Sequence, residues 1–507
     1  MNPIKRLAGQ TAIYGIPSIL TRFLNYLLVP LYTYGILTPA EYGVVNVFYS
    51  YSALLMVILT YGMETAFFRF SETHPDRKMV FSTGLTSILV SSGLFLILTN
   101  LFPSTIATWI DYSQYPVFII WFAWILALDA IAAIPFAKLR ADNRPGRFAL
   151  VKSVSILSNV FLNLFFLLLC PWIYKHHGES FGGQLIDLFY RPDWTIEYIF
   201  ISNLIASLVT LVMLLPQVLR IKWAFDPVLW QRMLIYALPL LIAGMAGIVN
   251  ETFDRLLLRY LLPSDIAEDQ VGIYSACYKI AVLMVLFIQA YRFAAEPFFF
   301  AQMKNKDAKE VYARVMDYFV ISVSLIFLVT MLYLDYVFIY FIGADFRSAR
   351  NVIPILMMAK LFLGIYFNIS IWYKLTGKTM WGALITIAGA IVSVGLNIYW
   401  IPRSPDHLIY GYLGSAWATF FCYATMMLLG YLIGQKYYPI RYNLRKVIGF
   451  PLLAASVYIV SRILAVENTL SGILINTSLF ILFLAIIAFV ERKDMVSLWL
   501  SIRRKTG

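Results

Sequence analysis

The sequence predicts an all-α polytopic membrane protein with about 14 transmembrane helices. The chain is 61% hydrophobic and only 13% charged, whereas soluble domains carry about 25% charged residues. Apolar runs recur along the whole sequence at about the 20-residue length that crosses a bilayer. The basic residues gather in every second break between these runs, as they do in membrane proteins with short loops.

The fourteen expected spans are separated by short polar breaks. They lie near 10–35, 41–68, 80–100, 116–138, 148–170, 195–219, 233–261, 271–298, 312–341, 351–373, 380–401, 411–434, 447–464 and 470–490. No small-residue cleavage pattern follows the first run, which is also too long for a signal-peptide core, so we expect an uncleaved span. The second span should begin with a capping box, in which Thr38 and Glu41 satisfy each other's backbone N–H groups.

The distribution of Lys and Arg sets the orientation. With the N-terminus inside, 28 of the 40 basic residues face the cytoplasm, eight face outward and four lie within spans. This asymmetry follows the positive-inside rule and predicts that both termini are cytoplasmic. The net charge of +13 is therefore a property of the topology, and we expect no nucleic-acid partner.

Cysteine and histidine give no indication of a metal site or of catalysis. Cys170, Cys277 and Cys422 lie in or beside apolar runs, without disulfide or metal-ligand spacing. The four histidines fall in predicted loops. We expect no catalytic residues, no metal, no cofactor and no ATP site. Transport would then draw on an ion gradient, the membrane potential or consumption of the substrate.

Arg22 is the most informative residue of the first span. It lies near mid-depth, where a lipid-facing cation costs at least about 2.5–3.5 kcal/mol. Water, a carboxylate or an anionic ligand must therefore stabilise it. Two interpretations stay open: Arg22 lines a wet cavity, or it pairs with a carboxylate and holds two helices together.

A weak internal repeat relates the two halves of the chain. A Tyr-x-x-Pro motif opens the first span at 14–17 and the seventh at 236–239. The segments 41–43 (Glu-Tyr-Gly) and 270–272 (Gln-Val-Gly) each open the span that follows. Both copies start inside, which favours a parallel duplication of six spans about an axis along the membrane normal. Chance similarity between apolar segments is the alternative.

At these motifs the sequence resembles a known family. Leu37–Gly43 (Leu-Thr-Pro-Ala-Glu-Tyr-Gly), Gly62–Glu64 and Arg69 resemble the opening of polysaccharide-export flippases. These are the Wzx-type members of the multidrug/oligosaccharidyl-lipid/polysaccharide exporter superfamily. The start of their second half is similar to Tyr236–Pro239, Asp254–Arg255 and Gly272–Tyr274.

The resemblance implies two six-helix lobes around a central cationic cavity, followed by two C-terminal helices. We place the N-lobe at 1–219, the C-lobe at 220–435, and the last two spans with a basic tail at 436–507. It also implies flipping of an undecaprenyl-diphosphate-linked oligosaccharide from the cytoplasmic to the outer leaflet by alternating access. This would serve O-antigen or capsule synthesis in a bacterial inner membrane. The expected partners are the lipid-linked oligosaccharide, membrane lipids and other polysaccharide-assembly proteins, with the protein itself a monomer.

Five basic residues are candidates for binding the diphosphate, because arginine and lysine bind phosphate oxygens with charged hydrogen bonds. They are Arg22, Lys360, Arg255, Lys279 and Arg292. Four lie well within spans and the fifth, Arg255, lies near the outer end of one. Local ion pairing is the alternative. Arg255 and Arg292 each have a glutamate four residues away on the same helix, which could neutralise them. Arg22 and Lys360 have no such neighbour, so they are the stronger candidates.

A second set of residues is a candidate for coupling to sodium or protons. It comprises Asp254, Asn250, Glu251, Asn397 and Glu64. Lipid II flippases, which this chain resembles, place a sodium site between spans seven, eleven and twelve. Here the eleventh span offers Asn397 and no carboxylate, which departs from that pattern. Structural ion pairing through Asp254 is the alternative.

Three other functions remain as alternatives. A lipid II-type flippase of peptidoglycan precursors has the same number of helices and a cationic cavity. A multidrug exporter of the superfamily usually has twelve helices and favours an acidic cavity. A membrane polysaccharide polymerase or ligase needs a sizeable outer loop, whereas the longest one expected here, 171–193, has about 20 residues.

Overall fold

The computed structural model describes residues 23–177, 184, 186–219, 223–303, 305–464 and 469–492. Within these ranges the chain forms helices and no strand. The helices are Phe23–Thr33, α2 (Pro39–Thr60), α3 (Met63–Thr73), α4 (Arg77–Leu101), α5 (Pro103–Trp109), α6 (Pro116–Ala141), α7 (Pro145–Leu164), the π-helix η1 (Phe165–Leu169), α8 (Cys170–His177), α10 (Ile196–Leu219), α11 (Pro227–Leu261), α12 (Ser264–Gln302), α13 (Ala308–Leu332), α14 (Leu334–Phe341), the 3₁₀-helix η2 (Ala344–Ala349), α15 (Val352–Ile369), α16 (Ile371–Leu375), α17 (Met380–Trp400), α18 (Gly411–Tyr437), α19 (Leu444–Ile463) and α20 (Thr469–Val490).

Thirteen helical segments in the described part of the chain are long and apolar enough to cross a membrane. Each of them coincides with one of the last thirteen predicted spans, which confirms those predictions. The first predicted span lies partly outside the described residues, and its described portion is the apolar helix Phe23–Thr33. Arg22 also lies outside the described residues.

The predicted span at 312–341 was wrong at its end. The long helix α13 stops at Leu332, and α14 forms a separate short helix. Asp335 lies in the first turn of α14 and pairs with Arg350 and with Arg462 (2.9 Å). This charged group keeps the start of α14 outside the apolar span, although the composition of α14 is as hydrophobic as that of a span.

The helix starts follow the residues that the sequence provides. At α2 the predicted capping box is confirmed: the Thr38 hydroxyl accepts from the Glu41 N–H at 3.3 Å, and the Glu41 carboxylate accepts from the Thr38 N–H at 2.7 Å. Asp76 and Asp226 cap α4 and α11 in the same manner, each accepting two backbone N–H groups. Side chains thus satisfy the first N–H groups of these helices, which have no intrahelical partner.

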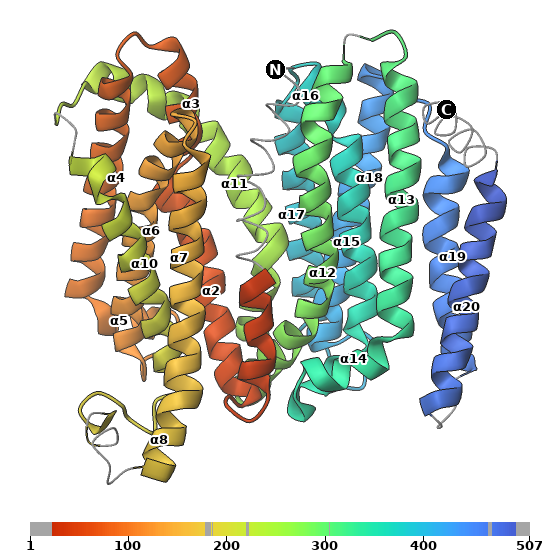
Figure 1. Cartoon of the computed structure of the whole chain (residues 1–507), viewed down its shortest axis with the longest axis horizontal. Helices are drawn as coiled ribbons and strands as arrows, with labels where there is room; N and C mark the ends of the chain where they lie inside the picture. Colours follow the sequence, from red (N-terminus) through yellow and green to blue (C-terminus); the bar gives the residue numbers. More distant parts are fainter. Residues whose placement is uncertain are drawn as a thin grey trace, which may run out of the picture.

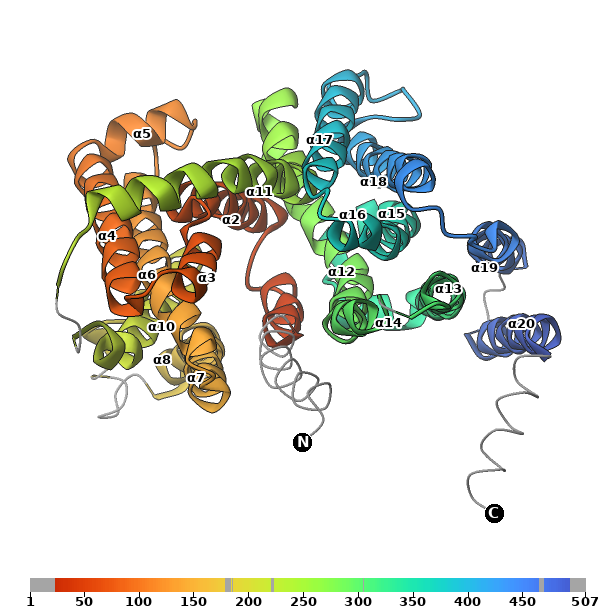
Figure 2. The same ribbon diagram turned by 90° about the horizontal axis from the view of Figure 1, so that it is seen from above.

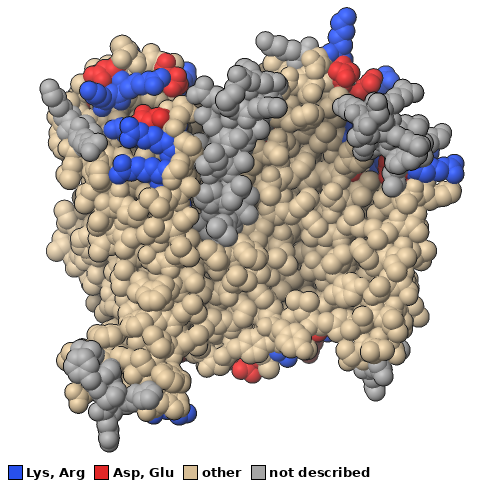
Figure 3. Space-filling view, viewed as in Figure 1, with Lys and Arg blue, Asp and Glu red and all other residues tan. Residues whose placement is uncertain are grey.

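The helices form two lobes, with α19 and α20 beside the second (Figure 1). One lobe contains α2 to α10, and the other contains α12 to α18. Helix α19 packs on α13, and α20 contacts α19 and α13, so the last two helices lie outside the second lobe (Figure 2). Charged side chains gather at the upper rim of both lobes, while the broad middle band has almost none (Figure 3). This distribution is what a bilayer-spanning protein requires.

The lobes meet where α2 crosses α12, near the end that we predict to be outer. The two backbones approach closely at Gly43 and Gly272. A Cβ on Gly43 would overlap the carbonyl group of Glu268, and one on Gly272 would overlap that of Pro39. Gly43 and Gly272 are the corresponding residues of the internal repeat. An axis along the membrane normal between the lobes would bring such a pair together, although the superposition of the halves stays a prediction.

Helix α11 connects the lobes along its length of 35 residues (Figure 2). Its first half packs on the N-lobe, where Trp230 donates to the Ser87 hydroxyl at 2.7 Å and the Tyr236 ring lies 4.3 Å from the Arg69 guanidinium. Pro239, inside the helix, has no N–H to give to the helical ladder and favours a bend. The second half packs on α17, α12 and α2. The proposed lobe boundary at 220 stays a prediction, but the first turns of α11 lie against the N-lobe.

Candidate functional site

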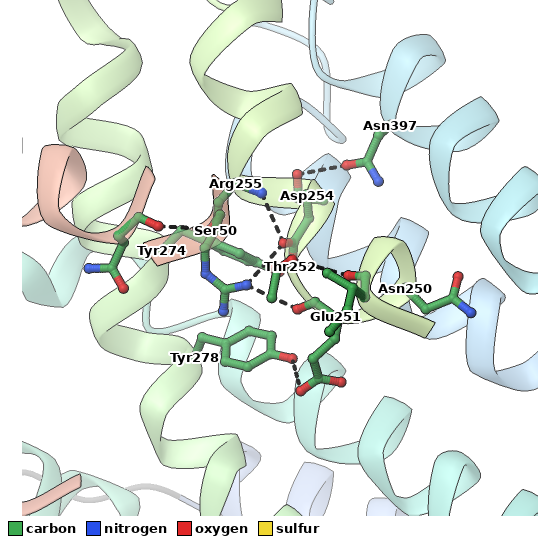
Figure 4. A network of polar contacts seen from close by, with 12 residues as sticks. Ser50, Asn250, Glu251, Thr252, Asp254, Arg255, Tyr274, Tyr278 and Asn397 are labelled. Carbon is green, nitrogen blue, oxygen red and sulfur yellow. Dashed lines mark hydrogen bonds and ion pairs between the residues drawn. The ribbon is translucent and has the colours of Figure 1, made fainter. Parts of the chain in front are cut away.

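A cluster of charged and polar side chains surrounds the second half of α11 (Figure 4). Asp254 pairs with the neighbouring Arg255 at 3.1 Å and accepts a hydrogen bond from the Tyr274 hydroxyl at 2.6 Å. Both charged side chains are more than nine-tenths buried. The Arg255 guanidinium also donates to the Glu251 backbone carbonyl at 3.0 Å and lies 4.3 Å from the centre of the Tyr278 ring. Arg255 is therefore held inside the protein by several partners.

Lys360 on α15 pairs with Glu251 on α11. Its ammonium donates to the Glu251 carboxylate at 3.0 Å, and the same oxygen accepts from the Tyr423 hydroxyl at 2.8 Å. The Lys360 side chain is 0% exposed and that of Glu251 is 38% exposed. The other carboxylate oxygen accepts from the Tyr278 hydroxyl at 3.2 Å, so the glutamate is held by protein partners although its side chain is partly exposed.

These contacts correct two expectations. The sequence favours Lys360 as a diphosphate ligand because it has no acidic neighbour on its own helix, but the structure gives it a partner on another helix. The spacing of Glu251 and Arg255 also suggests a side-chain ion pair between them. In the structure Arg255 pairs with Asp254 instead and donates to the backbone carbonyl of Glu251. The spacing of residues along one helix does not reveal ion-pair partners that come from other helices.

For Arg292 the structure contains the local pair that was the alternative to diphosphate binding. Arg292 and Glu296 are 3.2 Å apart, and Lys374 reaches the same glutamate at 2.7 Å. The Arg292 guanidinium also lies 3.9 Å from the centre of the Phe367 ring. In this conformation the Arg292 guanidinium contacts Glu296 and Phe367.

Four of the residues proposed for ion coupling lie in the polar network around α11, and the fifth, Glu64, lies elsewhere (Figure 4). Asn250 donates to the Thr386 carbonyl at 3.0 Å, while Asn397 accepts from Ser415 at 2.8 Å. Asp254 and Glu251 each have a cationic partner, Arg255 and Lys360. Glu64 is in the other lobe, where it pairs with Arg140. The described residues thus bring Asn250, Glu251 and Asp254 together on α11 but offer no carboxylate there without a protein cation.

A cavity of about 250 Å³, which we call the inter-lobe cavity, is lined by residues of the first half of the chain and by Lys279 of α12 in the second lobe. Its polar lining consists of amide and phenol side chains together with one lysine. These residues are Asn25, Asn46, Asn159, Asn203, Tyr32, Tyr42, Tyr49 and Lys279. Among the described residues that line it, Lys279 is the one that carries a charge, and the structure shows no carboxylate paired with it. Lys279 is therefore the predicted cation that the structure places in a cavity.

A second and larger cavity, of about 450 Å³, lies within the N-lobe; we call it the N-lobe chamber. It is lined by side chains of α2, α3, α6, α7 and α10, and it shares Asn25, Asn159 and Asn203 with the inter-lobe cavity. The two spaces are therefore adjacent. Its polar lining is Glu64, Asp129, Arg140, Lys152, Ser155, Ser207 and Thr210 in addition to these three amides.

Sequence reasoning missed most of these lining residues. The predicted candidates were ionisable side chains within spans and two amides near them, Asn250 and Asn397, and so they did not include Asn159 and Asn203. Their position inside apolar helices was nevertheless a usable indication, because an amide in a span needs a polar partner or water. Asn203 finds such a partner in the Tyr49 hydroxyl at 3.0 Å.

At the predicted outer end, Arg259 joins the lobes. Its guanidinium pairs with Asp111 at 2.9 Å and with Glu268 at 3.5 Å, and it donates to the Tyr112 hydroxyl at 3.3 Å. Only 7% of the Arg259 side chain is exposed. Together with the glycine contacts of α2 and α12, these ion pairs join the two lobes at the predicted outer end. Towards the predicted cytoplasmic end the lobes diverge (Figure 1).

Comparison with known proteins gives a family and a fold. Residues 7–303 match the family model described as "Polysaccharide biosynthesis protein". A structure described as lipid II flippase MurJ in an inward closed conformation matches with a TM-score of 0.68 at 13% identity, covering 95% of this chain and 99% of that one.

Multidrug transporters of the MATE family are similar as well. An inward-facing structure has a TM-score of 0.56 at 14% identity, covering 86% of this chain and 94% of that one. A mutant of the Vibrio cholerae transporter VcmN also has a TM-score of 0.56 at 14% identity, covering 85% of this chain and 95% of that one. At such identities the likeness shows the fold alone. A search of curated proteins found no match.

Proposed function

Because the chain belongs to the polysaccharide biosynthesis protein family, we propose that it flips an undecaprenyl-diphosphate-linked oligosaccharide. Its fold is that of flippases of the multidrug/oligosaccharidyl-lipid/polysaccharide exporter superfamily. Transport would run from the cytoplasmic to the outer leaflet of a bacterial inner membrane and supply O-antigen or capsule synthesis. The family and the fold are those of transporters and flippases rather than of catalysts.

The observation that carries this proposal is the inter-lobe cavity with Lys279. Its amide and phenol groups can exchange hydrogen bonds with a sugar, and its single lysine can bind a diphosphate. A charged hydrogen bond contributes about 1.5–3 kcal/mol, which is strong enough to select an anion and weak enough to release it. An acidic cavity, which a cationic drug would favour, is not what the described lining offers.

The arrangement of the lobes supports alternating access. The lobes touch at Gly43, Gly272 and Arg259 near the predicted outer end and diverge at the other. Opening of this junction with closure of the opposite end would move the cavity from one side of the membrane to the other. Helix α11, which packs on both lobes, would have to bend during such a change.

The experiment compares transport in proteoliposomes by the wild-type chain and its variants. The cargoes are an undecaprenyl-diphosphate-linked oligosaccharide and lipid II, each scored by its accessibility on the far leaflet. Lys279→Ala should reduce flipping of the oligosaccharide by about tenfold or more, the size of one lost charged hydrogen bond. Arg22→Ala should do the same if that residue lines the cavity, and Arg22→Lys should keep part of the activity because its charge remains.

Lys378→Ala, which removes an exposed lysine from a loop, is the matched control and should leave transport unchanged. Faster flipping of lipid II than of the oligosaccharide would replace the proposed cargo with a peptidoglycan precursor. Normal flipping by a well-folded Lys279→Ala protein would contradict the role of the cavity. Flipping of neither lipid by the wild-type protein would contradict the proposed function.

A further inference from the structure

The N-lobe chamber and the inter-lobe cavity differ in charge. Two acidic and two basic residues line the chamber, Glu64, Asp129, Arg140 and Lys152, so their formal charges cancel. The inter-lobe cavity carries only the charge of Lys279 among its described lining residues. An anion therefore gains more by binding beside Lys279, and the chamber has no net charge that would attract a diphosphate.

The charged groups of the chamber are held by local contacts. Glu64 and Arg140 form an ion pair, and Lys152 lies 4.3 Å from the centre of the Phe136 ring. Asp129 interacts with the Ser207 hydroxyl and with the charge of Lys152. These contacts make the chamber a polar surface of balanced charge, which is suited to a ligand rich in hydroxyl groups.

The amides have hydrogen-bonding capacity beyond the bonds that they make. An asparagine side chain has two N–H donors and a carbonyl with two lone pairs. In the structure Asn203 donates one hydrogen bond to Tyr49. Asn159 donates a long one, 3.4 Å, to Asn25 and accepts one from the Asn163 amide at 3.3 Å. Asn25, Asn159 and Asn203 stand at the boundary of the two cavities, where a ligand lying in both would pass them.

The size of the chamber fits a small polar ligand. Its volume of about 450 Å³ lies within the range of about 300–1,000 Å³ that is typical of small-molecule pockets. Phe136 and Phe148 pack edge to face, with ring centres 5.4 Å apart, and both line the chamber. Aromatic rings beside amides and hydroxyls match the mixture of C–H faces and O–H groups that a sugar presents.

We propose that the N-lobe chamber binds the sugars nearest the diphosphate, while Lys279 binds the diphosphate itself. Asn159 and Asn203 are then specificity-determining residues that recognise sugar hydroxyls where the linings of the two cavities meet. This inference rests on the proposed function. It adds that two parts of the lipid-linked oligosaccharide bind at two places: the diphosphate in the inter-lobe cavity and the sugars in the N-lobe chamber.

The test measures binding of two lipids to the purified full-length chain in nanodiscs. One lipid is a polyprenyl-diphosphate-linked oligosaccharide, and the other is the same polyprenyl diphosphate without sugar. Asn203→Leu, which keeps the side-chain volume and removes the amide, should weaken binding of the glycosylated lipid by about tenfold. Its effect on the sugar-free lipid should be less than about threefold. Lys279→Ala should weaken both lipids to a similar extent.

Two further variants make the result decisive. Asn159→Leu repeats the test at a second amide and replaces Asn203→Leu if that protein does not fold. Asn100→Leu changes an exposed amide of the N-lobe outside both cavities and should alter neither affinity. Equal effects of the amide variants on the two lipids, or no effect on either, would overturn the assignment of the chamber. Failure of the wild-type chain to bind either lipid would instead count against the proposed function itself.

Discussion

At the scale of single residues, the pair of Glu251 and Lys360 is asymmetric. The lysine is fully buried, while more than a third of the glutamate side chain is exposed. A buried charge without a partner is costly, because no water replaces the lost attraction. An exposed carboxylate can be hydrated instead. Loss of its partner should therefore destabilise the buried Lys360 more than the partly exposed Glu251.

This asymmetry predicts a rank order of stability. Glu251→Gln leaves Lys360 buried without its counter-charge and should destabilise the protein by about 3–5 kcal/mol, the range for breaking a buried pair. Lys360→Met removes the charge but keeps an apolar stem. It should cost clearly less, because Glu251 is partly exposed and still accepts hydrogen bonds from the Tyr278 and Tyr423 hydroxyls. Thermal unfolding of the purified proteins measures the order. A melting temperature of Lys360→Met at or below that of Glu251→Gln would contradict this account.

At the scale of elements, the crossing of α2 and α12 depends on two glycines. Here helix backbones touch without side chains between them, as small residues allow in membrane proteins. At Gly272 an added methyl group would meet the Pro39 carbonyl and the Gly43 N–H. Neither backbone group can rotate away as a side chain could. The residues of the weak repeat are thus placed where the lobes must come closest.

We predict that Gly272→Ala opens the outer end. Overpacking costs about 1–3 kcal/mol, and a strain that exists only in the closed state shifts the equilibrium by about 5- to 150-fold. Asn46→Cys, in the inter-lobe cavity, should then react faster with a membrane-impermeant thiol reagent from outside. Gly93→Ala is the control, because open space surrounds that glycine. Equal labelling rates in the Gly272→Ala and Gly93→Ala backgrounds would rule out this junction as the outer gate.

At the scale of the whole molecule, the positions of the basic residues predict how the protein is oriented in the membrane. Both termini should be cytoplasmic because Lys and Arg are concentrated on that side. The natural cysteines suit a labelling experiment, since Cys170, Cys277 and Cys422 are each 0% exposed. In intact cells, Asp406→Cys should react with an impermeant reagent and Asn305→Cys should react only after permeabilisation. The opposite pattern would invert the topology.

The sequence by itself determined the class of protein and most of its helices. Apolar length predicted thirteen spans that the described structure contains, and the Thr38 capping box was predicted residue by residue. Hydrophobic length suffices for this because a bilayer leaves the backbone few alternatives to a helix. Hydrophobic length gave a wrong end for the span at 312–341. Its last part, α14, is a separate apolar helix with the charged residue Asp335 in its first turn.

Only the tertiary structure decided which charges are available to a ligand. Lys360 and Lys279 are both lysines within apolar spans, and nothing local distinguishes them. The first meets Glu251, which is 109 residues away along the chain, and the second lies in a cavity of amides and tyrosines. Charges and amides act over a few ångströms in space, so their partners depend on how helices pack. Spacing along one helix can be read from the residues alone, whereas contacts between distant helices exist only once the chain has packed.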